Sequence, residues 1–187
     1  MALTTLDPKT ALILIDLQKG IVALPTAHAA GPVVARSAAL AEAFRTVGLP
    51  VVLVNVTGGA PGRTEQPRRI GDMPPDWSEI VPELNQHLSD LLVSKRTWGA
   101  FMHTDLEARL RTLGVTQVVL AGVATSIGVE STARQAYELG FNVTFAIDAM
   151  TDLNADAHLN STTRIFPRMG ETGATEDIIA LLKSTHG

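Results

Sequence analysis

Short apolar runs recur along this chain, and they constrain its fold more than any other feature. Ala11–Ile15 is apolar at every position, which suits a central parallel strand covered by helices on both faces. Val51–Val56 is rich in β-branched residues and fits the same description. Further strands are predicted at Leu91–Ser94, Gln117–Ala121 and Asn142–Ile147.

Segments with helical spacing of apolar residues lie between and after these runs. Within them, Thr104 and Glu107 predict a capping box, and Thr175 and Ser126 are expected N-caps. Strands that alternate with helices predict an α/β fold with a mainly parallel sheet, in a single domain over residues 1–187. The predicted helices are Gly31–Val47, Thr104–Leu113, Ser126–Leu139, Asn154–Ile165 and Glu176–Lys183.

Composition narrows the classes of partner. The net charge of −4 gives no electrostatic reason to bind nucleic acid or an anionic membrane, and no apolar stretch is long enough to span a bilayer. The chain has no cysteine and no basic segment leading into an apolar one near its start, so we expect a cytoplasmic protein without disulfides. The mean hydropathy of +0.18 fits either a large core or a homodimer or higher homo-oligomer, and we expect the latter.

The stretch Val118–Thr132 combines a strand, a tight turn at Gly122 and a helix start near Ser126. Such turns lie at the carboxyl edge of a parallel sheet, where ligands usually bind. Unpaired N–H groups at the helix start could stabilise a negative oxygen. An ordinary strand-to-helix crossover would give the same pattern.

Three motifs stand out in order along the chain: ILIDLQ at Ile13–Gln18, KRTWGAF at Lys95–Phe101, and GVATSIGVESTARQAYELG at Gly122–Gly140. Together they resemble the isochorismatase-like hydrolases, also called the cysteine hydrolase superfamily. The likeness runs from about Ala11 to Asp177. It implies a three-layer αβα sandwich around a six-stranded sheet.

The resemblance also implies a catalytic site. The family's Asp, Lys and Cys fall on Asp16, Lys95 and Gly128, so the first two carry over and the nucleophile does not. By the strand prediction, all three positions lie at or just past carboxyl ends of strands and should converge. A carboxylate beside an ammonium can deliver a proton to a substrate. The alternatives are a turn cap for Asp16 and a solvated charge for Lys95.

Glycine has no nucleophile, so no covalent intermediate can form at Gly128. True isochorismatases resemble this chain there, and they hydrolyse a vinyl ether by protonating its alkene carbon. The resemblance therefore implies a hydrolase of a small, isochorismate-like molecule. Two alternatives are an amide hydrolase whose cysteine was replaced at Gly128, and a non-catalytic binding protein. Ser126 and Ser131 lack an evident base and are poor substitute nucleophiles.

Further site residues follow from the resemblance. It implies a cis peptide bond between Val123 and Ala124, with the N–H groups of Ala124 and Gly128 directed into the site. Plain packing is the alternative for Gln18, Trp98 and Phe101. The expected substrate-binding or oxyanion residues are Gln18, Trp98, Phe101, Val123, Ala124 and Thr125.

The segment Thr57–Pro75 is predicted to be a long loop. Its Arg63, Arg68 and Arg69 could pair with a carboxylated substrate or could simply be solvated. Relatives that hydrolyse nicotinamide carry an Asp-x-His metal motif where this chain has Asn55-Val56-Thr57. The histidines show no paired ligand spacing, so we expect no metal and no cofactor.

Overall fold

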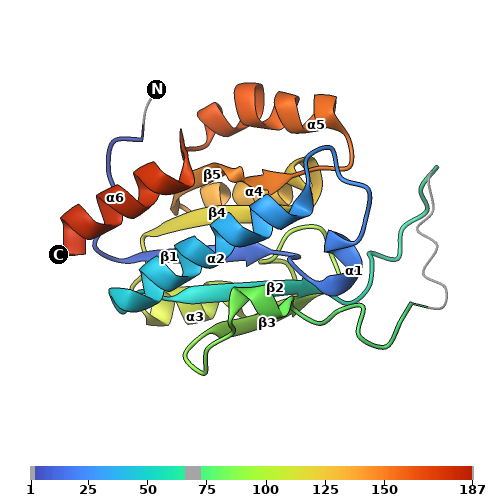
Figure 1. The fold of residues 1–187 in the computed structure, drawn as a ribbon, viewed down its shortest axis with the longest axis horizontal. Coiled ribbons are helices and arrows are strands. Elements are labelled where there is room, and N and C mark those ends of the chain that lie inside the picture. Colours follow the sequence, from blue (N-terminus) through green and yellow to red (C-terminus); the bar gives the residue numbers. More distant parts are fainter. Residues whose placement is uncertain (1–2, 66–72, 187) are drawn as a thin grey trace.

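The computed structural model describes residues 3–65 and 73–186, and their centre is a six-stranded, wholly parallel sheet (Figure 1). The strand order is β3-β2-β1-β4-β5-β6, so β1 lies in the middle. The strands are β1 (Thr10–Ile15), β2 (Val51–Val56), β3 (Leu91–Lys95), β4 (Gln117–Val123), β5 (Asn142–Thr151) and β6 (Glu171–Gly173).

Helices cover both faces of the sheet, which confirms the predicted three-layer α/β architecture (Figure 1). α2 and α6 pack on one face through residues such as Phe44 and Leu182, and α3 and α4 pack on the other through Leu110 and Ala133. The helices are α1 (Lys19–Val22), α2 (Ala30–Thr46), α3 (Leu106–Thr112), α4 (Glu130–Glu138), α5 (Ala155–Asn160) and α6 (Thr175–His186). Short helical turns are η1 (Pro82–Leu84), η2 (Thr125–Val129), η3 (Ser161–Ile165) and η4 (Phe166–Arg168).

Several predicted helix starts were wrong. The chain enters α4 through the π-helical turn η2, and the N–H of Ser126 donates to Asp152 Oδ2 at 2.6 Å. Ser126 is therefore not the N-cap. Thr104 does not form the expected capping box, because its hydroxyl accepts from Leu106 N and α3 begins at Leu106. Thr175 is the first residue of α6, and its hydroxyl donates to Asp148.

The turn after β4 depends on close contact with β1. Gly122 has φ of +120°, and a Cβ there would lie 2.1 Å from the carbonyl oxygen of Ile15. Only glycine permits this approach. The β4–β5 register also shifts between Leu120 and Gly122. The turn after β4 lies beside Asp16 at the end of β1, where a Cβ built on Gly128 would be 3.2 Å from Asp16 Oδ2.

No helix among the described residues is both long and apolar enough to cross a membrane.

Candidate active site

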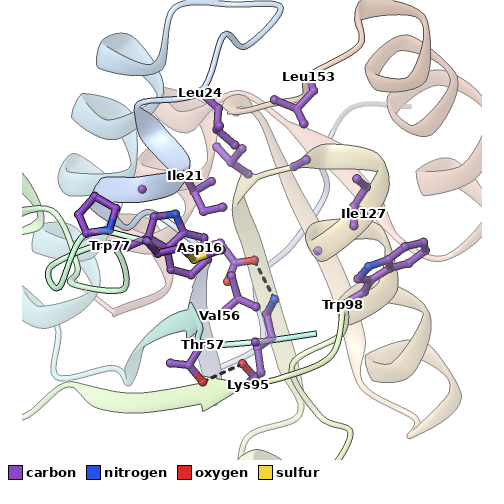
Figure 2. Close-up of a pocket in the computed structure, with 17 residues that line it drawn as sticks. Asp16, Ile21, Leu24, Val56, Thr57, Trp77, Lys95, Trp98, Ile127 and Leu153 are labelled. Atoms are coloured by element: carbon purple, nitrogen blue, oxygen red, sulfur yellow. Dashed lines mark hydrogen bonds and ion pairs between the residues drawn. The ribbon is translucent and has the colours of Figure 1, made fainter. Parts of the chain in front are cut away.

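The carboxyl ends of β1 and β3 bring together the first two predicted site residues. Asp16 follows β1 directly with φ of +52°, and Lys95 is the last residue of β3, on the far side of β2. Lys95 Nζ donates to Asp16 Oδ2 at 2.7 Å (Figure 2). The Lys95 side chain is 1% exposed and the Asp16 side chain is 8% exposed. The two residues form a buried ion pair, and removing one partner from such a pair typically costs about 3–5 kcal/mol.

The segment after Lys95 is fixed to α4. Lys95 Nζ also donates to the carbonyl of Thr97 at 3.2 Å. Ala100 N donates to Thr132 Oγ1 at 3.1 Å, and Phe101 N donates to Gln135 Oε1 at 3.0 Å. These bonds position Lys95 and the residues that follow it against the helix of the third motif.

Gly128 lies in η2 and faces the ion pair. A Cβ built on it would be 3.2 Å from Asp16 Oδ2 and 2.9 Å from Ile15 Cγ2. A side chain at this position would therefore point at the Asp16 carboxylate and crowd Ile15. The structure thus brings Asp16, Lys95 and Gly128 together at one edge of the sheet, although it does not test their roles.

A cis peptide bond joins Val123 and Ala124, as the resemblance implied, and both residues line the pocket. The expected oxyanion role of the Ala124 and Gly128 N–H groups stays a prediction. Thr125 is buried behind the turn and is not among the lining residues. Its hydroxyl lies 2.8 Å from His158 Nδ1.

A pocket of about 540 Å³ opens above the ion pair (Figure 2). Asp16 and Lys95 are the only charged side chains among its described lining residues. Trp77 and Trp98 stand on opposite sides of it. The lining residues are Asp16, Gly20, Ile21, Leu24, Val56, Thr57, Gly58, Met73, Pro74, Trp77, Lys95, Trp98, Val123, Ala124, Ile127, Gly128 and Leu153.

Two expected binding residues have other environments. Gln18 is fully buried, donating to the carbonyl of Val56 at 3.1 Å and accepting from its N–H at 2.7 Å, so it braces β2. Phe101 belongs to the core and stacks on Phe141, with the ring centroids 5.9 Å apart. Neither residue lines the pocket. Trp98 does line it.

Sequence reasoning missed Trp77. This residue lies two positions past the end of the predicted loop Thr57–Pro75, and only the folded chain shows that this segment returns to the end of β1. There, Gly20 N donates to the carbonyl of Trp77 at 2.9 Å. The one signal available was rarity, because Trp77 and Trp98 are the chain's two tryptophans.

The loop arginines contribute no described contact to the pocket. Arg63 is exposed and does not line it, and Arg68 and Arg69 lie outside the described residues. Residues 3–65 and 73–186 contain no group of three or more His, Cys, Asp or Glu side chains that could hold a metal ion. Asn55, at the position of the metal motif, instead donates to the carbonyl of Ser78 at 2.8 Å.

Comparison with known proteins identifies the family of the chain. The Isochorismatase domain model matches residues 10–177. The uncharacterized isochorismatase family protein YwoC of Bacillus subtilis (strain 168) is 42% identical over 182 residues, covering 94% of this chain and 95% of its own length.

Solved structures show the same fold. An isochorismatase family protein from Burkholderia thailandensis has a TM-score of 0.92 at 42% identity, covering 96% of this chain and 98% of its own. An N-carbamoylsarcosine amidase from Thermoplasma acidophilum has a TM-score of 0.73 at 26% identity, covering 90% and 97%. The domain match, the relatives and the fold together place the chain in the isochorismatase family of hydrolases.

Proposed function

We propose that this protein hydrolyses a small vinyl ether at the Asp16–Lys95 pair, without a covalent intermediate at position 128. The observation that carries the proposal is the position of Gly128. A side chain there would point at Asp16 Oδ2 from 3.2 Å, whereas glycine leaves that side of the carboxyl group open to substrate and water. Chemistry that needs an acid and a water, but no nucleophilic side chain, fits this arrangement.

Each step can be assigned to groups that line the pocket. A proton passes from the Lys95 ammonium to the Asp16 carboxylate along their 2.7 Å hydrogen bond, so that the pair stays neutral overall. The resulting carboxyl group of Asp16 gives this proton to the terminal alkene carbon, where the π-electron pair forms the new C–H bond. Water then adds to the resulting oxocarbenium carbon, and its surplus proton returns to Asp16. The hemiketal collapses to a carbonyl compound and an alcohol. Lys95, 2.7 Å away, stabilises the Asp16 carboxylate between the two proton transfers.

The test is turnover of vinyl ethers by the wild-type protein. Isochorismate would release pyruvate, and phenyl vinyl ether would release phenol and acetaldehyde. We expect turnover of at least one of them and none of simple amides such as nicotinamide, because Gly128 supplies no nucleophile. We also propose that the reaction is metal-independent, so turnover should persist in EDTA. Amide hydrolysis, or no hydrolysis of any vinyl ether, would contradict the proposal.

An amide hydrolase is the second candidate, and the geometry of position 128 favours it specifically. The direction of the Cβ there would place a cysteine thiol beside Asp16 and Lys95, and the structurally similar Thermoplasma acidophilum protein is named an amidase. Under this reading, Gly128 replaced a nucleophile. A non-catalytic binding protein is the third candidate, and it would bind ligands in the pocket without any turnover.

We further propose that the partner is a small molecule, that the chain works in the cytoplasm as one domain, and that it forms a homo-oligomer. The small-molecule proposal is supported by the pocket of about 540 Å³, which has the size of a typical ligand site. The composition supports the proposals of a cytoplasmic location, a single domain and a homo-oligomer.

A further inference from the structure

Two indole rings form opposite walls of the pocket. Figure 2 shows Trp77 on one side and Trp98 on the other, with the Asp16–Lys95 pair between and below them. We call Trp77, Trp98, Ile21 and Ile127 the indole slot. All four side chains line the pocket, and none carries a charge. The reacting pair thus lies at the base of an aromatic and aliphatic enclosure.

The wall at Trp77 is built into the fold. A Cβ at Gly20 would lie 1.8 Å from Trp77 Cδ1, so the indole lies directly against the glycine backbone. The carbonyl of Trp77 accepts from Gly20 N at 2.9 Å and from Gln18 Nε2 at 3.2 Å. On the outer side, Lys19 Nζ lies 3.0 Å from Asp76 and 2.7 Å from Glu79. Contacts from several directions therefore fix the position of the ring.

Trp98 is the complementary wall, and much of its surface is uncovered. Trp98 as a residue is 55% exposed, although the backbone that follows it is hydrogen-bonded to α4 through the N–H groups of Ala100 and Phe101. An indole held at a pocket rim gains apolar contact when a planar ligand packs against it.

The charges among the pocket's described lining residues disfavour an anionic ligand. Asp16 and Lys95 already neutralise each other at 2.7 Å, and the other fifteen of the 17 described lining residues carry no charge. Arg96 lies against Gly58, but it is exposed and outside the lining set. Among the described lining residues, a carboxylate would meet no cation besides the Lys95 ammonium that Asp16 already contacts. Burying a carboxylate there should therefore cost more than burying a neutral ether.

We infer that the indole slot selects an uncharged, planar aromatic group and rejects carboxylates, so the substrate class is a neutral aryl ether rather than a dicarboxylate such as isochorismate. The inference about reactivity rests on the proposed function, because the aryl group is taken to carry the vinyl ether that Asp16 protonates. The selection itself is a property of binding and can be measured without turnover.

The experiment uses two probes that cannot be hydrolysed by this route: phenetole, a neutral aryl ether, and phenoxyacetate, its carboxylated counterpart. Both of the chain's tryptophans line the slot, so quenching of intrinsic tryptophan fluorescence reports occupancy directly. We expect phenetole to bind wild-type protein at least about tenfold more tightly than phenoxyacetate. Equal or tighter binding of phenoxyacetate would overturn the inference.

Two variants, with one control, test separately how the indole and the charge balance contribute to ligand selection. Trp98→Leu should weaken phenetole binding by about fivefold or more, whereas Tyr137→Leu should leave it unchanged. Tyr137 is a matched control because it is 53% exposed, on α4, and outside the pocket. Asp16→Asn removes the negative charge that Lys95 Nζ contacts at 2.7 Å, so it should narrow or reverse the preference for phenetole over phenoxyacetate. An unchanged phenetole affinity in Trp98→Leu would overturn the role of the slot.

Hydrolysis of phenyl vinyl ether separates this inference from the proposed function. If phenetole binds as expected but no phenol is released, the proposed hydrolysis fails and the selection stands. If phenol is released but phenoxyacetate binds better than phenetole, the hydrolysis stands and the selection fails.

Discussion

At the scale of single residues, position 128 separates the candidate mechanisms. Gly128→Cys would place a thiol against Asp16 and Lys95, since a Cβ there already lies 3.2 Å from Asp16 Oδ2, while Ile15 would have to yield slightly. A neighbouring ammonium makes a thiol more reactive near neutral pH. We expect the introduced thiol to react with iodoacetamide faster than free cysteine, and we expect vinyl-ether turnover to fall because the side chain obstructs the site.

Ser131→Cys is the matched control, because it adds a thiol on α4 outside the pocket. If the Gly128→Cys thiol reacts no faster than the Ser131→Cys thiol, position 128 does not face the ion pair in solution, and the three-residue site must be abandoned.

Some site residues could be predicted from the sequence and others could not. Asp16, Lys95 and Gly128 were predicted to converge because each belongs to a distinctive motif at a strand end. Trp77 was not found, because its place depends on a loop returning to Gly20 through backbone hydrogen bonds that any residues could make. Phe101 lies in a recognised motif yet packs in the core, so motif membership alone does not distinguish a pocket wall from its support.

At the scale of elements, strands were predicted more accurately than turns. β2 has the predicted bounds Val51–Val56, because its apolar residues are all buried and only Asn55 interrupts the run. β6 was not located from its residues, since Glu171–Gly173 is three residues long and lacks an apolar pattern. The π-helical turn η2 was also missed. Its Ser126 N–H donates to the side chain of Asp152, which follows β5 and is distant in sequence.

The contacts of His158 with η2 lead us to expect that the stability of the protein depends on pH. His158 Nδ1 lies 2.8 Å from Thr125 Oγ1, and the His158 ring meets the His28 ring edge-on, with centroids 4.8 Å apart. Burial, and then the charge of His28, lower the pKa of His158 below its usual 6.5, and Asp152 partly opposes this effect. The unfolded chain therefore binds more protons near pH 6.5, so the free energy of unfolding should decrease as pH falls through that value.

The measurement is the thermal midpoint between pH 5 and 7.5, a range of about one unit or more around the ordinary histidine value. His158→Asn should flatten the decrease seen in the wild type. His103→Asn is the control, because His103 is exposed and has a positive φ that asparagine tolerates. This variant should show the same decrease of the thermal midpoint as the wild type. An identical slope in wild type and His158→Asn would show that another group causes the dependence.

At the scale of the whole molecule, the structure confirms the three-layer order that the family resemblance implied, whereas self-association stays a prediction. We expect a homo-oligomer, most simply a two-fold dimer, because the chain is apolar for its size. Light scattering at micromolar concentration checks this directly. A mass corresponding to one 19.8 kDa chain would contradict it.

The central claim is that Asp16 supplies the proton for hydrolysis, and a matched pair of variants tests it. Asp16 and Asp90 are both buried carboxylates that receive a 2.7 Å contact from a cation, Lys95 and Arg45 respectively, but only Asp16 lines the pocket. Asp16→Asn and Asp90→Asn therefore impose comparable losses of a buried ion pair, and circular dichroism would identify the folded fraction of each.

The decisive measurement is kcat/KM for vinyl-ether hydrolysis, corrected for that folded fraction. Asp16→Asn should reduce it by about 10²- to 10⁴-fold, the usual contribution of a general acid, whereas Asp90→Asn should leave it close to wild type. If Asp16→Asn retains wild-type kcat/KM on a verified substrate, or if both variants lose activity equally, Asp16 is not the proton donor and the account of this site is wrong.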